Sequence, residues 1–114
     1  MNKERIEEII RVDHAGEHGA TAIYKGTLDI LNLYGDEETK RIIKEMAEGE
    51  KKHVNEFNKL IKDRSIRPTA LLTFWKITGY SLGALSAIYG KQAIMACTEA
   101  VEEVIDKHYS NQIE

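Results

Sequence analysis

Cysteine, proline and strand-like alternation are nearly absent from this sequence. Cys97 is the only cysteine, which excludes an internal disulfide framework and a cysteine-based metal cluster and suits a reducing compartment. Pro68 is the only proline, and alternating β-branched runs are scarce, so helices are expected rather than strands. The opening segment MNKERIEEII is too charged and too poor in small residues for a secretory signal peptide.

An excess of charge of one sign is also missing. The 16 basic and 19 acidic residues are interleaved and give a net charge of −3, so no nucleic-acid partner is expected. The content of 42% apolar and 31% charged residues is typical of a folded chain rather than a disordered one. A chain of this length is expected to form a single domain, residues 1–114, with a modest core.

The spacing of apolar residues predicts three or four helical segments over nearly the whole chain. The first should cover Lys3–Tyr34 and stop at Gly35, a residue that commonly ends helices. The second should begin at Asp36, a good N-cap, and end near Arg64. The third is expected over Thr69–Gly90, and a last helix follows to the end of the chain. The predicted fold class is therefore all-α.

The segment Thr69–Gly90 is unusually apolar, because Lys76 is its only charged residue. A helix of that length would be roughly 33 Å long, which is borderline for crossing a bilayer. Its threonines, serines and glycines favour instead a buried central helix or one that lies in a membrane interface. Gly79 and Gly83 form a Gly-x-x-x-Gly pair, which permits the close approach of another helix.

Three of the predicted helices carry acids in the middle of an apolar stripe. Asp13 and Glu17 continue the stripe of the first helix, Glu50 and His53 that of the second, and Glu102 that of the last. An unpaired carboxylate in a dry interior costs several kcal/mol. Divalent iron or manganese would compensate, because carboxylates and imidazole match the ligand preference of these metals. A Glu-x-x-His pair on one helix face is the arrangement of ferritin-like di-metal bundles.

Each of these signals has an ordinary alternative. A single Glu-x-x-His spacing is close to an even chance in a chain with this many acids and four histidines. Glu17 alone can pair with a lysine, and Glu102 faces solvent if its helix is rotated. Three histidines are expected as surface, capping or supporting residues rather than ligands: His14, His18 and His108. The metal interpretation is favoured because all four candidate ligands, on three different helices, fall on the apolar stripes.

The sequence resembles the demethoxyubiquinone hydroxylases, carboxylate-bridged di-iron monooxygenases of ubiquinone biosynthesis, in three stretches: RVDHAGEHGATAIYKG, EGEKKHVNEFNKL and IRPTALLTFWKITGYSLGALSAIYGKQAIMACTEAVEEVIDKHYSNQI. The resemblance extends from about Ile9 onward, in the same order and with similar spacing. It implies a ferritin-like helical bundle with an iron cofactor. It further implies that Glu17 is a ligand to one iron, that the catalytic Glu50 bridges both irons, that His53 binds one of them and that Glu102 binds the second.

The family pattern continues into a further helix with a second Glu-x-x-His, which these 114 residues do not include. The resemblance therefore implies an incomplete bundle with four of the expected six ligands, from a truncated relative, one piece of a split gene or a fragment of a longer product. The implied reaction hydroxylates the ring of a demethoxyubiquinol with O₂, and the chain alone is expected to be weakly active or inactive. The polyprenyl substrate implies a peripheral position on the cytoplasmic side of the cell membrane, with Thr69–Gly90 facing the bilayer.

Two other functions stay open at this point. One is an iron-binding, ferritin-like dimer in which two copies contribute Glu17, Glu50 and His53 across a two-fold axis. The other is a catalytically inactive helical module that keeps membrane or assembly contacts. The expected partners are accordingly O₂ and a polyprenyl quinol, a membrane surface, and either a second copy or a separate C-terminal segment.

Overall fold

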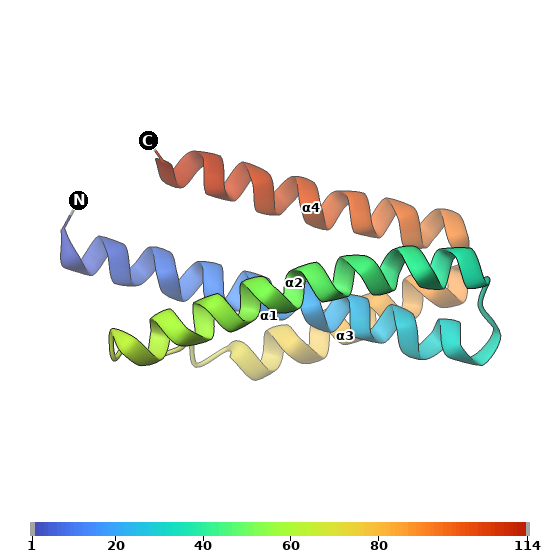
Figure 1. Cartoon of the computed structure of the whole chain (residues 1–114), viewed down its shortest axis with the longest axis horizontal. Coiled ribbons are helices and arrows are strands. Elements are labelled where there is room, and N and C mark those ends of the chain that lie inside the picture. Colours follow the sequence, from blue (N-terminus) through green and yellow to red (C-terminus); the bar gives the residue numbers. More distant parts are fainter. Residues whose placement is uncertain (1, 114) are drawn as a thin grey trace.

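Four helices make up nearly all of the computed structural model, which describes residues 2–113 without the side chains of His108, Asn111 and Ile113. They are α1 (Lys3–Tyr34), α2 (Glu37–Asp63), α3 (Leu72–Tyr89) and α4 (Lys91–Ile113), and the described residues contain no strand. Successive helices alternate in direction, so both ends of the chain lie at the same end of the bundle (Figure 1). The all-α prediction is confirmed, whereas the prediction for the His108 side chain falls outside the described residues.

Local capping sets the ends of the first two helices, as the sequence predicts. The backbone N–H of Gly35 donates to the carbonyl of Leu31 and closes the last turn of α1. The Asp36 carboxylate then accepts hydrogen bonds from the N–H of Glu38, at 3.1 Å, and from the Thr39 hydroxyl, at 2.6 Å. The bond from Glu38 satisfies one of the N–H groups that the first turn of α2 leaves without a partner.

The third helix begins later than the sequence analysis expects. It starts at Leu72 rather than Thr69, because residues after Pro68 first form a turn. In that turn the N–H of Leu72 donates to the Thr69 carbonyl, and the N–H of Leu71 donates to the Thr69 hydroxyl at 3.3 Å.

Helix α1 lies at the centre of the bundle and packs against all three other helices. Its predicted stripe is buried from Ile10 to Leu31 at steps of three and four residues. Each large apolar side chain that is fully buried contributes about 1.5–3 kcal/mol. The core cluster joins all four helices and consists of Tyr24, Leu31, Ile43, Ala87 and Ile94.

Glycines bring α1 and α3 into backbone contact. A Cβ atom on Gly79 would lie 2.7 Å from the carbonyl oxygen of Gly19, and one on Gly83 would overlap the backbone of Ile23. From the other side, a Cβ on Gly26 would overlap the carbonyl of Tyr80. The close approach predicted for the Gly-x-x-x-Gly pair is therefore confirmed.

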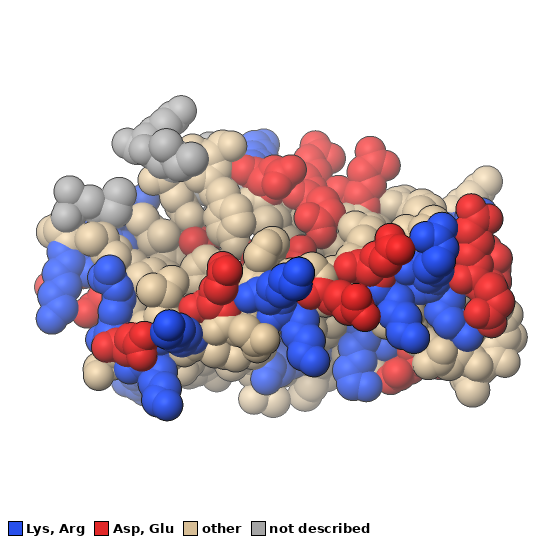
Figure 2. All heavy atoms as spheres, viewed as in Figure 1, with Lys and Arg blue, Asp and Glu red and all other residues tan. Residues whose placement is uncertain are grey.

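Because α3 packs through its small residues, its large apolar side chains point outward. Phe74 is 57% exposed, Ile77 63% and Ile88 57%, whereas the buried positions are Gly79, Gly83, Ser86 and Ala87. The interpretation of this segment as a buried central helix is wrong. No helix among the described residues is long and apolar enough to cross a membrane. In contrast to α3, the outer face of α2 carries interleaved acidic and basic side chains (Figure 2).

Candidate metal centre

Two helices bring three of the predicted ligands together. Glu17 comes from the buried stripe of α1, and Glu50 and His53 come from one face of α2. One donor atom of each residue lies within 4.8 Å of the others. The Nδ1 atom of His53 is 3.5 Å from the Oε2 atom of Glu17 and 3.5 Å from the Oε2 atom of Glu50. The Glu-x-x-His spacing therefore aims both side chains at the carboxylate of the neighbouring helix.

Both carboxylates of this group are buried. Glu17 is 1% exposed and Glu50 is 5% exposed, and their Oε2 atoms have no hydrogen-bond partner among the described residues. Burial, together with the hydrogen bond and the charge of Glu17, raises the pKa of Glu50 to about 9. In the absence of a cation, Glu50 therefore holds a proton at neutral pH.

Glu102 approaches this pair from α4. Its Oε1 atom accepts a 2.6 Å hydrogen bond from the Tyr24 hydroxyl, and it contributes to the raised pKa of Glu50. It lies outside the group of three donor atoms that share one centre. The structure thus places all four predicted ligands in one region, in which Glu50 interacts with both Glu17 and Glu102. The open side of the site is at His53, whose side chain is 52% exposed.

Two tyrosines that the sequence analysis does not single out hold the carboxylates in place. The Tyr24 hydroxyl on α1 donates to Glu102 on α4, and the Tyr109 hydroxyl on α4 donates to Glu17 on α1. Burial, followed by the bond to its glutamate, raises the pKa of each tyrosine, so both stay protonated donors. Each tyrosine follows a glutamate of its own helix by seven residues and so shares its face, which is the signal that could have identified them.

Three further polar contacts join the helices around the site. The Gln112 amide of α4 donates to Asp13 of α1 at 2.6 Å. The Nε2 atoms of His14 and His18 lie 2.8 and 2.9 Å from the Oδ1 atom of Asn58 on α2. His14 is buried, and burial is the main cause that lowers its pKa. Both histidines therefore link α1 to α2 and lie outside the donor group, in the supporting role that the sequence predicts.

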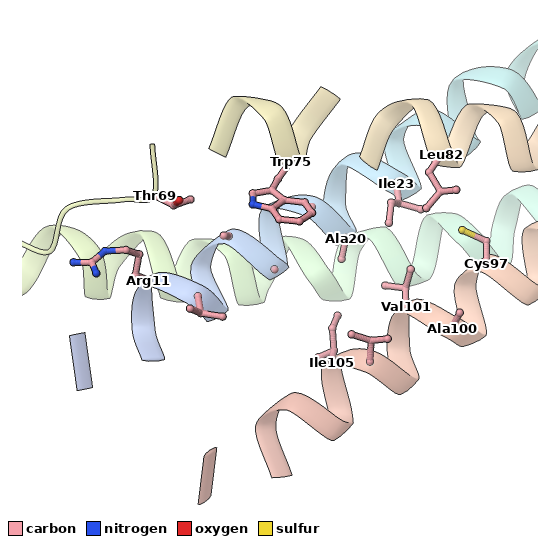
Figure 3. A pocket seen from close by; sticks show the side chains of 15 residues that line it. Arg11, Ala20, Ile23, Thr69, Trp75, Leu82, Cys97, Ala100, Val101 and Ile105 are labelled. Carbon is pink, nitrogen blue, oxygen red and sulfur yellow. The ribbon is translucent and has the colours of Figure 1, made fainter. Parts of the chain in front are cut away.

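An apolar cavity of about 600 Å³ lies between α1, α3 and α4 (Figure 3). Side chains from the three helices point into it, including Ala20, Ile23, Trp75, Leu82, Val101 and Ile105. A smaller hollow of about 200 Å³ shares Val12 and Ile105 with this cavity and is also lined by Glu17 and Tyr109. The two hollows therefore adjoin, and the smaller one reaches Glu17.

The chemistry of the donors fits a divalent metal ion. Two carboxylates and one imidazole are the oxygen and nitrogen ligands that Fe²⁺ and Mn²⁺ accept. The buried Oε2 atoms of Glu17 and Glu50 lack the partner that a cation would supply. A bound cation would also remove the cost of burying two negative charges side by side.

Comparison with known proteins identifies the family of this chain. The family model described as "Ubiquinone biosynthesis protein COQ7" matches residues 4–114. The NADPH-dependent 3-demethoxyubiquinone 3-hydroxylase, mitochondrial, of Bos taurus is 47% identical over 113 residues, which cover 99% of this chain and 51% of the relative. The 3-demethoxyubiquinol 3-hydroxylase of Rhodospirillum rubrum is 44% identical over 107 residues, covering 94% of this chain and 50% of the relative.

A third relative, the 5-demethoxyubiquinone hydroxylase, mitochondrial, of Saccharomyces cerevisiae, is 41% identical over 108 residues, covering 95% of this chain and 46% of the relative. The chain thus spans about half the length of the curated relatives that it matches. A match over nearly every residue of the chain is consistent with the resemblance seen in the sequence. This chain belongs to the ubiquinone biosynthesis protein COQ7 family.

Proposed function

We propose that these helices form the metal-binding part of a hydroxylase that acts on the ring of a demethoxyubiquinol with O₂. The observation that carries this proposal is the meeting of Glu17, Glu50 and His53, together with the position of Glu17 beside a hollow that adjoins the apolar cavity. The three relatives named above are demethoxyubiquinone or demethoxyubiquinol hydroxylases. When bound, a pair of iron ions would supply the activation of O₂.

Each residue of the site has a distinct part in this proposal. Glu17, Glu50, His53 and Glu102 would hold the metal ions, and Glu50 is the central member of the set because it interacts with both of the other carboxylates. Tyr109 and Tyr24 donate to one oxygen of Glu17 and of Glu102. These hydrogen bonds fix the orientation of both carboxylates and leave each with a second oxygen for a metal.

The apolar cavity suits the quinol. Its volume of about 600 Å³ lies within the usual range for small-molecule sites, about 300–1,000 Å³. Its walls are almost entirely apolar, as a ring with a polyprenyl tail requires, and its polar side chains are at one end, at Arg11 and Thr69. The hollow next to Glu17 would place the ring beside this carboxylate.

Membrane docking through α3 accompanies this substrate. A polyprenyl quinol dissolves in the bilayer, and the exposed face of α3 offers Phe74, Ile77 and Ile88 to a lipid surface. Trp75 and Tyr80, which flank this face, are suited to the membrane interface. We infer a peripheral position with α3 in the interface. The cytoplasmic side of the cell membrane stays a prediction, and the bovine and yeast relatives are named mitochondrial.

Two ligands of a complete bundle site are still required. Ferritin-like di-metal sites take one glutamate from each of two helices and a Glu-x-x-His from each of two others. Glu17, Glu102 and the pair Glu50 and His53 account for three of these four contributions. We propose that a further segment with a second Glu-x-x-His completes the site from the open side at His53.

The half-exposed His53 also favours an alternative, a metal-binding dimer in which two copies share Glu17, Glu50 and His53. Metal-dependent dimers of the lone chain, with equal contributions from both copies, would support it. A third possibility is an inactive module, for which neither metal binding nor quinol turnover is expected.

The test combines metal binding with product formation. The chain is mixed with the C-terminal segment of a full-length relative, Fe(II) and a reductant, and hydroxylated quinol is measured by mass. Glu50→Ala should abolish both Fe(II) binding and product, whereas the exposed Glu48→Ala should change neither. Equal losses in the two variants would contradict the assigned site. Two bound irons in a confirmed complex without any product would contradict the proposed reaction.

A further inference from the structure

A second groove, away from the metal centre, runs between α1, α2 and α3. Its volume is about 770 Å³, and it has many more polar side chains in its lining than the cavity beside α4 has. Four lysines reach it from three helices: Lys25 from α1, Lys44 and Lys51 from α2, and Lys76 from α3. Lys76 is the only charged residue of the apolar segment 69–90. The proposed hydroxylation uses none of these side chains.

The groove carries a net positive charge. Against the four lysines it contains two acids, Asp29 and Glu48. Asp29 is already engaged, because it pairs with Lys25 at 3.3 Å and accepts a 2.6 Å hydrogen bond from Tyr80. The other three lysines, Lys44, Lys51 and Lys76, form no ion pair with any described side chain. They are therefore available to an anion.

The groove borders the exposed apolar face of α3. Lys76 and Tyr80 lie on the flank of α3 that faces α2, and Phe74 and Ile77 lie on the adjoining outer face. Basic side chains gather on the lower half of the face seen in Figure 2. An apolar helix face beside a row of free lysines is complementary to an anionic lipid surface. The apolar face matches the acyl chains, and the lysines match the phosphates.

We propose that this lysine groove binds the phosphate of an anionic phospholipid, so that docking through α3 selects bilayers that carry negative charge. This inference rests on the proposed docking of α3. In the docked protein, the outer face of α3 lies among the acyl chains, and Lys44, Lys51 and Lys76 lie at the depth of the headgroups. The groove then sets the orientation of the bundle on the bilayer.

Vesicle binding tests this proposal. Binding of the wild-type chain is compared on vesicles of phosphatidylcholine alone and of phosphatidylcholine mixed with phosphatidylglycerol, at one ionic strength. The wild type should bind the mixed vesicles more tightly. The double variant Lys44→Gln/Lys51→Gln should lose about fivefold in affinity per lysine on the mixed vesicles and nothing on the neutral ones. The control Lys59→Gln/Lys62→Gln removes the same charge from α2 outside the groove.

Four results would overturn the proposal. Equal losses in the groove and control variants would mean that net charge alone governs binding. Release of the protein by soluble glycerol phosphate would mean that the groove is a site for a small anion rather than for a lipid. Equal binding to both vesicles would refute the lysine groove and leave the docking of α3 intact, whereas binding to neither would refute both. Circular dichroism confirms that each variant is folded.

Discussion

The ionisation of one side chain, Glu50, links metal binding to pH. Its pKa rises from the ordinary 4.5 to about 9 in the folded chain, first through burial and then through Glu17. The folded state therefore favours protonated Glu50. The resulting contribution to stability is complete below pH 4.5 and is lost as the pH rises toward about 9.

We expect the free energy of unfolding of the metal-free chain to fall as the pH rises from 4.5 to about 9. The variant Glu50→Gln should lack this part of the pH dependence, because it has no proton to lose. Fe(II) binding must displace the proton of Glu50, so affinity should increase with pH over the same interval. Calorimetry in buffers with different ionisation enthalpies measures the proton released, and the absence of release at neutral pH would contradict the assignment.

The two tyrosines make a second prediction for single residues. Tyr109→Phe removes the hydroxyl that donates to Glu17 and leaves the ring in place. Loss of such a supporting hydrogen bond typically lowers metal affinity by about 10–100-fold, and we expect a loss in this range. The exposed Tyr34 provides a matched control, and Tyr34→Phe should bind metal as the wild type does. Unchanged affinity in Tyr109→Phe would show that packing alone orients Glu17.

Contact between helices depends on a few positions without side chains. Gly83→Ala forces a methyl group into the backbone of Ile23, and such overpacking costs about 1–3 kcal/mol of unfolding free energy. Gly49→Ala is the matched control, because a Cβ at Gly49 meets open space. It should stabilise α2 by about 0.5–1 kcal/mol. Urea denaturation of both variants measures the difference, and equal stabilities would mean that α1 and α3 separate without cost.

The exposed face of α3 gives a prediction of its own. Phe74→Asp/Ile88→Asp places charges on the face proposed to enter the bilayer, where each charge costs a few kcal/mol. The variant should dissociate from phosphatidylcholine vesicles. The control Leu33→Asp changes an apolar residue on α1 that is even more exposed, and it should leave vesicle binding unchanged. Full retention of the double variant on vesicles would exclude α3 as the docking face.

Sequence patterns predict the helices well because their signals are local. The caps at Gly35 and Asp36 lie within one turn of the helix ends that they set. For α3 the composition alone does not distinguish a buried helix from one that faces outward, because both can be apolar. The choice depends on which face packs, and only the spacing of Gly79 and Gly83 carries that information.

The site follows the same division between local and long-range information. Glu50 and His53 are on one face of one helix, so their proximity is readable from their spacing. The bonds of Tyr24 to Glu102 and of Tyr109 to Glu17 join residues 78 and 92 positions apart. They depend on the register between α1 and α4, which no local pattern specifies.

At the scale of the whole molecule, the metal centre and the bundle are expected to be completed together. The glutamate of α2 interacts with those of α1 and α4, and the hollows beside Tyr109 are bordered by Val12, Ile105 and Phe57. A helix pair that supplies a second Glu-x-x-His would cover this apolar surface and also neutralise the site through the metal. Binding of the helix pair and binding of the metal should therefore be coupled, so that each increases the affinity of the chain for the other.

The lone chain should bind fewer than two Fe(II) ions tightly, and addition of the C-terminal segment of a relative should raise this to two per complex. The same segment should bind more weakly when Fe(II) is removed, because binding free energies are reciprocal. Titration calorimetry with and without metal measures both effects. A variant segment in which the Glu and His are replaced by Gln keeps the apolar contacts and should lose only the metal-dependent part. If it binds as tightly as the intact segment in the presence of Fe(II), the bundle is completed by packing alone, and the open side at His53 is not a metal site.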